Sequence, residues 1–239
     1  MRFGETGAVL DGMGRQARKD DDGHTAVPLG TKLKPSQSRA RNTFETVLST
    51  AGELLAEVGF ERLTTNLVCE RAGLTPPALY RYFPNKYAIL SELAQRLMEA
   101  QDEAVLAWME AGGLEADSLA EAVEKNRRMQ EQVNEITRQM PGGIWIMRAL
   151  RAIPLLRDIR IASRDRVALQ ISENLRQRFP TVPQDELFRA ARLSTELMYA
   201  ATEMVLEEPD QDEARVNEEV CWMVALYYNR LAERHAAAG

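Results

Sequence analysis

Apolar residues recur at helical spacing along most of the chain after residue 37. The first stripe, within residues 38–58, follows steps of three and one. Its members are Phe44, Val47, Leu48, Ala51, Leu54, Leu55 and Val58. Gly59 follows as a helix-ending C′ glycine, and Phe60 then turns back towards the core. The pattern predicts a scaffold helix that supports the segment after it.

Two short helical patterns come next, separated by Gly73, which tolerates the backbone angles of a tight turn. The first spans about residues 65–72, and Thr64 is its natural N-cap. The second spans about residues 75–83. In it Leu79 and Phe83 lie four positions apart, so we expect them to lock this helix to the scaffold helix.

The second short helix opens with two prolines, Pro76 and Pro77, at positions where a missing N–H costs little. Because these prolines remove two free donors, we expect the Thr75 hydroxyl to cap the Ala78 N–H. A helix of this length is roughly 12 Å long, about the width of a DNA major groove. Helix, turn and short helix therefore predict a helix-turn-helix unit.

The rest of the chain shows six further helical patterns, separated by glycine and proline breaks. They cover about residues 86–108, 114–139, 144–154, 157–179, 185–207 and 212–235. We expect an all-α protein with three parts. Residues 1–37 form a disordered N-terminal arm, residues 38–85 a three-helix domain with the helix-turn-helix, and residues 86–239 a larger helical domain.

The net charge of −6 is unusual for a DNA-binding protein until it is divided along the chain. Residues 30–90 hold eight basic and five acidic side chains, a net charge of +3, whereas residues 91–239 carry −8. A basic module on an acidic body suits a protein that binds DNA with one part only. Basic residues just before the scaffold helix, such as Lys32, belong either to an arm that reaches DNA or to a solvated tail.

The second short helix and its flanks carry side chains that suit DNA. Tyr80 can donate to a phosphate, and Arg81 can bind a phosphate or a guanine edge. Lys86 lies in the first turn of the next helix, where a cation is unfavourable unless an anion is close. The alternative is an ordinary amphipathic surface helix; likewise Thr64 and Thr65 either bind a phosphate or only cap the helix.

Several classes of function lack the residues they need. The two histidines, His24 and His235, lie in the arm and near the C-terminus, so we expect no catalytic residue, no metal ligand and no cofactor. Cys69 and Cys221 lie far apart in helical patterns, which favours two buried thiols in a reducing cytoplasm. No run approaches the ~20 apolar residues of a membrane span. We expect no enzyme, no membrane partner and a cytoplasmic location.

The segment from Ala72 to Lys86 resembles the DNA-binding domain of the TetR family of bacterial transcriptional regulators. Members carry a turn of the type A-G-(V/L)-(S/T), followed by L-Y-x-(H/Y)-F-x-x-K, and this chain has AGLT at 72–75 and LYRYFPNK at 79–86. The resemblance covers about residues 38–90. Leu67 and Cys69 depart from it, since those positions are usually polar and Ala.

The resemblance implies roles for nine residues. Thr64, Thr65, Thr75, Tyr80 and Lys86 would contact the DNA backbone, while Pro76, Pro77, Ala78 and Arg81 would lie against the bases. The two prolines offer no hydrogen bond, so shape readout would carry more of the specificity. The resemblance also implies a homodimer in which the last two helices of each chain form a four-helix bundle.

Met and aromatic side chains of the C-terminal part suit an adaptable apolar pocket. The predicted pocket residues are Trp108, Met140, Ile144, Trp145, Met147 and Tyr199; for each, plain core packing is the alternative. We therefore predict a ligand-released homodimeric repressor whose partners are a palindromic double-stranded operator, a second copy of itself and a small apolar or amphipathic effector. The competing hypothesis is a helical adaptor or effector sensor with a vestigial helix-turn-helix.

Overall fold

The computed structural model describes residues 27–33 and 38–236, and every regular element in them is helical, as predicted. The elements are α1 (Ser38–Arg62), α2 (Thr65–Ala72), α3 (Pro76–Tyr80), α4 (Lys86–Glu110), α5 (Leu119–Gln139), α6 (Gly143–Ala152), a 3-10 turn (Pro154–Leu156), α7 (Arg157–Arg178), α8 (Gln184–Glu207) and α9 (Glu213–Ala236). The predicted arm, residues 1–37, lies outside the described residues except for 27–33.

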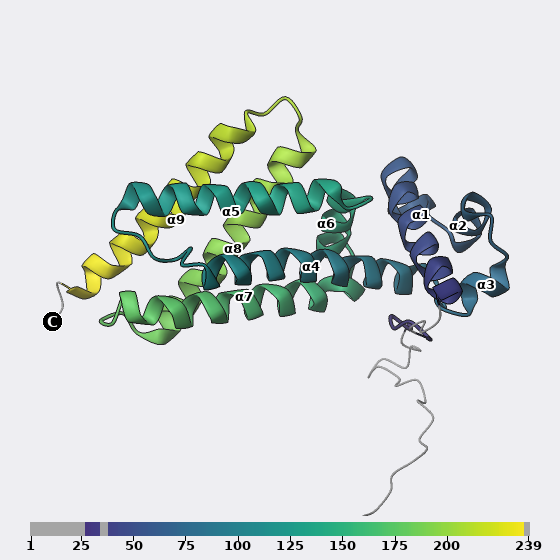
Figure 1. Cartoon of the computed structure of the whole chain (residues 1–239), viewed down its shortest axis with the longest axis horizontal. Coiled ribbons are helices and arrows are strands. Elements are labelled where there is room, and N and C mark those ends of the chain that lie inside the picture. Colours follow the sequence, from purple (N-terminus) through teal and green to yellow (C-terminus); the bar gives the residue numbers. More distant parts are fainter. Residues whose placement is uncertain (1–26, 34–37, 237–239) are drawn as a thin grey trace, which may run out of the picture.

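Helices α1, α2 and α3 gather at one end of the molecule around the stripe of α1 (Figure 1). Leu79 of α3 and Phe83 just after it are fully buried, and the Phe83 ring stacks on Phe44 with centroids 4.8 Å apart. α1 continues to Arg62, but Gly59 breaks it with φ 72° and ψ 171°. Only glycine adopts these angles without strain, so the predicted stop at residue 59 is a kink rather than an end.

The long helix α4 leaves this end and runs between α5 and α7 through the body of the molecule (Figure 1). Its first half is apolar and buried, whereas Gln101 and Asp102 are buried polar residues in its middle. α8 packs against α7 and α9 packs against α5, so the body is a bundle of five long helices. Within the described residues no helix is long and apolar enough to cross a bilayer.

The short helix α6 joins the two ends of the molecule. Ile146 and Leu150 of α6 belong to the same buried cluster as the α1 stripe. A Cβ added to Gly52 of α1 would lie 2.3 Å from the carbonyl oxygen of Pro141, and one added to Gly142 would lie 2.4 Å from the carbonyl oxygen of Gly52. The turn before α6 therefore touches α1 backbone to backbone, at a distance that only glycine permits.

Both cysteines are buried free thiols, as predicted. Burial raises the pKa of the Cys221 thiol to about 12, and it raises the pKa of the Cys69 thiol as well. A thiol with a raised pKa has little thiolate at neutral pH and is therefore unreactive. Cys69 and Cys221 thus serve packing, not chemistry.

Candidate nucleic-acid interface and ligand cavity

The turn between α2 and α3 is held by backbone and side-chain caps. Thr64 is extended and its hydroxyl accepts the Leu67 N–H at 3.1 Å, which is the predicted N-cap. Gly73 has φ 64° and ψ 31°, and its N–H donates to the carbonyls of Cys69 and Glu70. Because a residue with a side chain rarely adopts this left-handed conformation, Gly73 sets the angle at which α3 leaves α2.

The start of α3 differs from the prediction at Thr75. Its hydroxyl makes no cap hydrogen bond; the Thr75 carbonyl accepts the N–H of Ala78 at 2.9 Å and of Leu79 at 3.3 Å instead. With prolines at the first two helical positions, these are the first N–H groups of α3, and the backbone carbonyl already satisfies them. The expected side-chain cap is wrong, and the exposed Thr75 hydroxyl remains available to a ligand.

Tyr80 and Thr65 connect the two short helices on their exposed side. The Tyr80 hydroxyl and Thr65 Oγ1 are 2.9 Å apart, and Tyr80 is 38% exposed. This hydrogen bond fixes the tyrosine ring across the face of α3 before any DNA is bound. Pro76, Pro77 and Arg81 are exposed on α3 and at its end, and Ala78 is half-buried.

The two cations near α3 lie in different surroundings. The Arg81 guanidinium lies 5.8 Å from the Tyr82 ring centre and has no acidic partner within the part of the chain that the structure describes. Lys86 Nζ donates to the Phe60 carbonyl at 3.1 Å and lies 4.2 Å from the Phe60 ring centre. These contacts hold the ammonium beside the Phe60 ring and leave N–H groups free for a phosphate.

A segment before α1 also reaches the end of α3, in the region where the sequence allows either an arm or a tail. The Lys32 N–H donates to the Tyr82 carbonyl at 2.8 Å, and Lys32 Nζ donates to the Tyr80 carbonyl at 3.1 Å. Asn85 caps α4 by accepting the Ala88 N–H, and its amide donates to the Pro28 carbonyl at 3.0 Å. Residues 27–33 therefore lie against the C-terminal end of α3.

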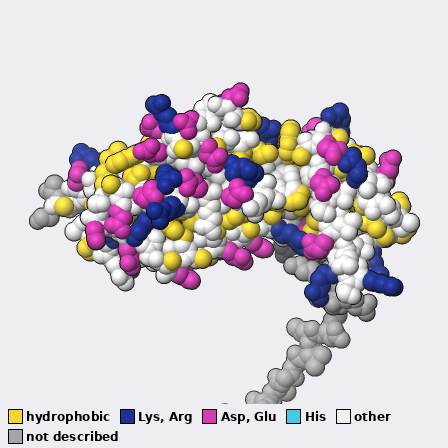
Figure 2. Space-filling view, turned by 45° about the horizontal axis from the view of Figure 1, so that its top comes forward, with side chains coloured by type: hydrophobic (Ala, Val, Ile, Leu, Met, Phe, Trp, Pro, Cys, Tyr) yellow, Lys and Arg dark blue, Asp and Glu magenta, His cyan; other side chains and the backbone are white. Residues whose placement is uncertain are grey.

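Basic side chains gather at the lower edge of this end of the molecule, and acidic and basic side chains mix over the rest of the visible face (Figure 2). Two ion pairs brace the end internally: Arg71 of α2 binds Glu57 of α1 with two contacts of 2.8 Å, and Arg96 of α4 binds Glu45 of α1 at 2.6 Å. Hydrogen bonds from these arginines lower the pKa of both glutamates. Both carboxylates are therefore ionised at neutral pH, and the pairs orient α2 and α4 on α1.

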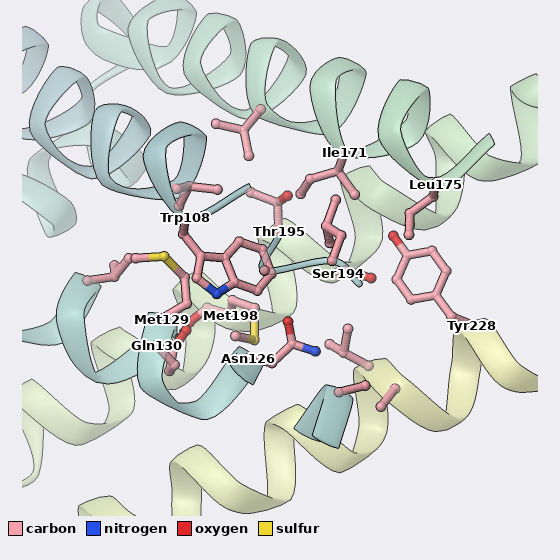
Figure 3. A pocket seen from close by; sticks show the side chains of 18 of the residues that line it. Trp108, Asn126, Met129, Gln130, Ile171, Leu175, Ser194, Thr195, Met198 and Tyr228 are labelled. Atoms are coloured by element: carbon pink, nitrogen blue, oxygen red, sulfur yellow. Dashed lines mark hydrogen bonds between the residues drawn. The ribbon is translucent and has the colours of Figure 1, made fainter. Parts of the chain in front are cut away.

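A cavity of about 200 Å³ lies in the body, between α4, α5, α7, α8 and α9. Figure 3 shows the Trp108 ring and the side chains of Met129, Met198 and Ile171 facing the same space. A Cβ on Gly113 would lie 2.2 Å from the Trp108 ring, so this glycine leaves the room that the indole occupies. The mostly apolar lining with a few polar groups suits a small organic ligand.

The structure brings only two of the six predicted pocket residues to this cavity, Trp108 and Tyr199. Met147 is buried in the cluster shared with α1, and Met140, Ile144 and Trp145 pack against that cluster. They lie there because α6 faces α1 and α4. Sequence reasoning missed most of the lining, including Gln101, Met129, Val133, Ile171, Leu175, Met198 and Tyr228.

Buried polar side chains tie the helices around the cavity together. Gln130 of α5 donates to the Thr202 hydroxyl of α8 at 2.9 Å, and Thr202 donates to Asn134 at 2.8 Å. Asn134 then donates to Asn217 of α9 at 3.1 Å. Such networks specify one arrangement of helices because a misplaced partner leaves a polar group buried without a hydrogen bond.

A second polar group joins α4 to α7. Asp102, 2% exposed, accepts from the Ser163 hydroxyl at 2.8 Å and from Arg166 at 2.5 Å. Burial raises the pKa of Asp102 although both partners oppose the shift. Tyr199 lies 3.4 Å from the Ser163 hydroxyl, and burial raises its pKa to about 12, which keeps the phenol neutral. No group of three or more potential metal ligands occurs among residues 27–33 and 38–236.

Comparison with known proteins agrees with this geometry. Residues 47–93 match the model of the bacterial regulatory proteins of the tetR family. The class C tetracycline repressor protein of Escherichia coli is 50% identical over 54 residues, which are 23% of this chain and 25% of that protein. The nucleoid occlusion factor SlmA of Haemophilus ducreyi is 29% identical over 114 residues, 48% of this chain and 52% of that protein.

The chain spans only about a quarter of the length of the tetracycline repressors that it matches. The similarity to solved structures covers much more of the chain. A TetR-family regulator from Streptomyces coelicolor covers 79% of this chain and 99% of its own length, with a TM-score of 0.53 and 25% identity. The structure of a SmeT–triclosan complex matches 78% of this chain and 91% of its own chain, with a TM-score of 0.58 and 21% identity. This match supports the fold alone. The N-terminal helices are homologous to those of tetracycline repressors, and residues 47–93 carry the conserved module of the bacterial regulatory proteins of the tetR family.

Proposed function

We propose that this protein is a homodimeric repressor that binds a palindromic operator and is released from it by a small apolar or amphipathic effector. Residues 38–85 would bind DNA, and residues 86–239 would bind the effector and the second copy. A bacterial protein with this function acts in the cytoplasm, where the DNA is. The observation that carries the proposal is the ordered, exposed face of α2 and α3 at the end of a body with a cavity.

The DNA-binding face combines fixed and free groups. Tyr80, held by Thr65, would donate to a phosphate, and Thr64 would meet the backbone beside it. The hydroxyl of Thr75 and the guanidinium of Arg81 are exposed and would turn to the DNA. Lys86 would exchange its contact with the Phe60 carbonyl for a phosphate. Pro76, Pro77 and Ala78 would lie against the bases and read their shape.

Dimerisation through α8 and α9 is supported by their exposed apolar side chains. A water-facing patch of this kind on two adjacent helices is typical of a protein–protein contact. The exposed members are Leu193 (56%), Leu197 (37%), Met204 (41%), Met223 (54%), Leu226 (50%) and Tyr227 (42%). A two-fold axis through this face would pair the helices of both copies and present two α3 helices to successive major grooves.

Release by an effector would act through α4. This helix lines the cavity with Gln101, Val105 and Trp108, and its first half is packed into the DNA-binding end. An effector that binds better to one position of α4 shifts the population towards it. When that position separates the two α3 helices by the wrong distance, operator affinity falls.

A gel-shift assay on the promoter next to the protein's own gene tests the function. We expect a sequence-selective shift that weakens steeply with salt, because phosphate contacts release counterions. Tyr80→Ala and Lys86→Ala should each lower affinity about tenfold or more, while the control Arg176→Ala, an exposed cation on α7, should not. Thermal melting of each variant separates loss of contact from loss of fold. Repression that survives both substitutions would favour the adaptor hypothesis.

A further inference from the structure

Two buried polar atoms that have no hydrogen-bond partner among the described residues belong to side chains lining the cavity. They are Gln101 Oε1 and the Tyr228 hydroxyl oxygen. Three other such atoms belong to Arg160, Gln184 and Asn217, none of which lines the cavity. A buried polar group without a partner costs roughly 1–3 kcal/mol, so a bound molecule that supplies both partners would gain from them.

The orientation of the Gln101 amide follows from its neighbours. Nε2 donates to Thr137 Oγ1 at 2.7 Å and lies 3.9 Å from Met147 Sδ, so both amide hydrogens have an acceptor. Thr137 in turn donates its own hydrogen to the Val133 carbonyl at 2.8 Å and can only accept from the amide. Oε1 is therefore the atom left over, and an amide oxygen can only accept.

The Tyr228 hydroxyl has the opposite role. Its ring stacks on Phe179 at the C-terminal end of α7, with centroids 6.3 Å apart. Figure 3 shows its oxygen pointing into the cavity on the side of Leu175 and Ser194, while the Ser194 hydroxyl donates to the Ala190 carbonyl at 2.9 Å. Burial raises the pKa of Tyr228 to about 12, although contact with the Ser194 hydroxyl opposes the shift, so the phenol keeps its proton. A ligand oxygen would compete with Ser194 for that proton.

The cavity is long and narrow. On α7 it is lined at four-residue spacing by Val167, Ile171, Leu175 and Phe179, a stripe of about 18 Å at 1.5 Å per residue. Gln101 lies at the end near α6, beside Thr137 and Met147, and Tyr228 lies at the end near Phe179. A total of about 200 Å³ along this length favours a slender molecule.

The lining disfavours an ion anywhere except beside Arg178, at the mouth of the cavity. Arg178 is the one charged side chain that lines the cavity within the described ranges. It is exposed, donates to the Leu114 carbonyl at 3.4 Å and lies 5.8 Å from the Phe179 ring centre. Desolvating a carboxylate or ammonium inside an apolar cavity without a charged partner is costly.

We propose that the effector is a slender, uncharged, largely apolar molecule with a polar group at each end: an O–H or N–H that donates to Gln101 Oε1, and an oxygen that accepts from the Tyr228 hydroxyl. This assignment rests on the proposed effector function of the cavity and narrows it to one chemical class. A ten-carbon chain with a hydroxyl at both ends, decanediol, is the simplest probe. Decanol has one of the two groups, and decanoate is the anionic probe.

Binding of these probes to the full-length protein, by tryptophan fluorescence and calorimetry, tests the assignment. Trp108 lines the cavity, so a ligand there changes its emission. We expect decanediol to bind roughly five- to tenfold tighter than decanol, the effect of one additional buried hydrogen bond. Decanoate should bind more weakly than decanol.

Two near-isosteric variants and a matched control locate the effect. Gln101→Met removes the acceptor and Tyr228→Phe the donor; each should abolish the preference for decanediol over decanol. Tyr87→Phe removes a tyrosine hydroxyl from α4 that does not line the cavity, and should keep the preference. Circular dichroism checks that each variant is folded.

Three results would overturn the assignment: no probe binds, decanediol binds no tighter than decanol, or decanoate binds tightest. None of them depends on DNA, so the operator assay tests the repressor function separately. A protein that prefers decanediol yet never binds DNA would retain the assignment of the ligand and lose the proposed function.

Discussion

The DNA-binding end and the body of this molecule differ in how their interiors are packed. At the DNA-binding end, Leu79 and Phe83 are fully buried in a cluster that continues into α4 and α6. In the body, helices of similar length surround a cavity and bury amides, hydroxyls and a carboxylate. An end that must hold a helix at a fixed angle benefits from dense packing, because a packed core has few alternative arrangements. A body that must admit a ligand needs space and unpaired polar atoms.

The largest difference between the two regions should appear when the same substitution, Leu to Ala, is made in each and the loss of unfolding free energy is compared. Leu79→Ala removes a side chain surrounded on every side and should cost about 3–5 kcal/mol of unfolding free energy. Leu175→Ala truncates a side chain that lines the cavity and has fewer contacts to lose, so we expect about 2 kcal/mol or less. Denaturant unfolding of both variants measures the difference. Equal costs would mean that the cavity is closed and packed in solution.

Arg81→Ala should leave the fold intact and weaken operator binding. The guanidinium is exposed and has no acidic partner in the described ranges, so folding loses little. A base contact is worth about 1–3 kcal/mol, and a phosphate contact lowers binding to all sequences alike. Affinity for the operator and for mutated operators distinguishes these roles, with Arg176→Ala as the control. Wild-type affinity in Arg81→Ala would exclude both.

Two threonines in the helix-turn-helix test which hydroxyls serve the fold. Thr64 accepts the Leu67 N–H, so Thr64→Ala should cost about 1 kcal/mol of stability. Thr75 makes no cap hydrogen bond, so Thr75→Ala should melt like the wild type and lose only DNA affinity. Calorimetry and gel shifts on both variants give the two readouts. A lower melting temperature for Thr75→Ala would indicate that the Thr75 hydroxyl does cap the helix in solution.

The smallest expected effect concerns Asp102 in the body. Its pKa is raised on folding, so the folded state binds a proton more readily than the unfolded chain does. This contribution to stability is complete below the unfolded pKa and is lost as pH rises through the folded pKa. The difference in unfolding free energy between wild type and Asp102→Asn should therefore shift in favour of the wild type as pH falls. A pH-independent difference would show that Asp102 does not titrate abnormally.

How far the sequence predicts the structure depends on the range of the interactions. Thr64 and Gly73 act within a few residues, so the helix-turn-helix can be read from the sequence. The helices of the body follow from periodicity as well, with ends that differ by a few residues. The expected side-chain cap at Thr75 is wrong because nothing in the composition shows that the Thr75 carbonyl accepts the N–H groups of Ala78 and Leu79.

The cavity is the feature that sequence reasoning located least well. Trp145 and Met147 have the composition of pocket residues, yet α6 turns them to α1 and α4. Gln101 and Tyr228 have no special sequence signature, and the free atoms of both depend on helices far away in the chain. A cavity is a place where packing partners are missing, and only the complete arrangement of helices reveals which residues lack them.

The contact of Gly52 with Pro141 and Gly142 has a mechanical consequence. Since the two backbones touch, α1 and the turn before α6 form a fixed contact point, and α4 packs against both α1 and α6. In the proposed repressor, a small displacement of α4 at Trp108 would rotate the DNA-binding end about this contact. A methyl group at position 52 would push α1 away from the turn before α6. Gly52→Ala should therefore uncouple effector binding from DNA release, even if the protein still binds both the effector and the DNA.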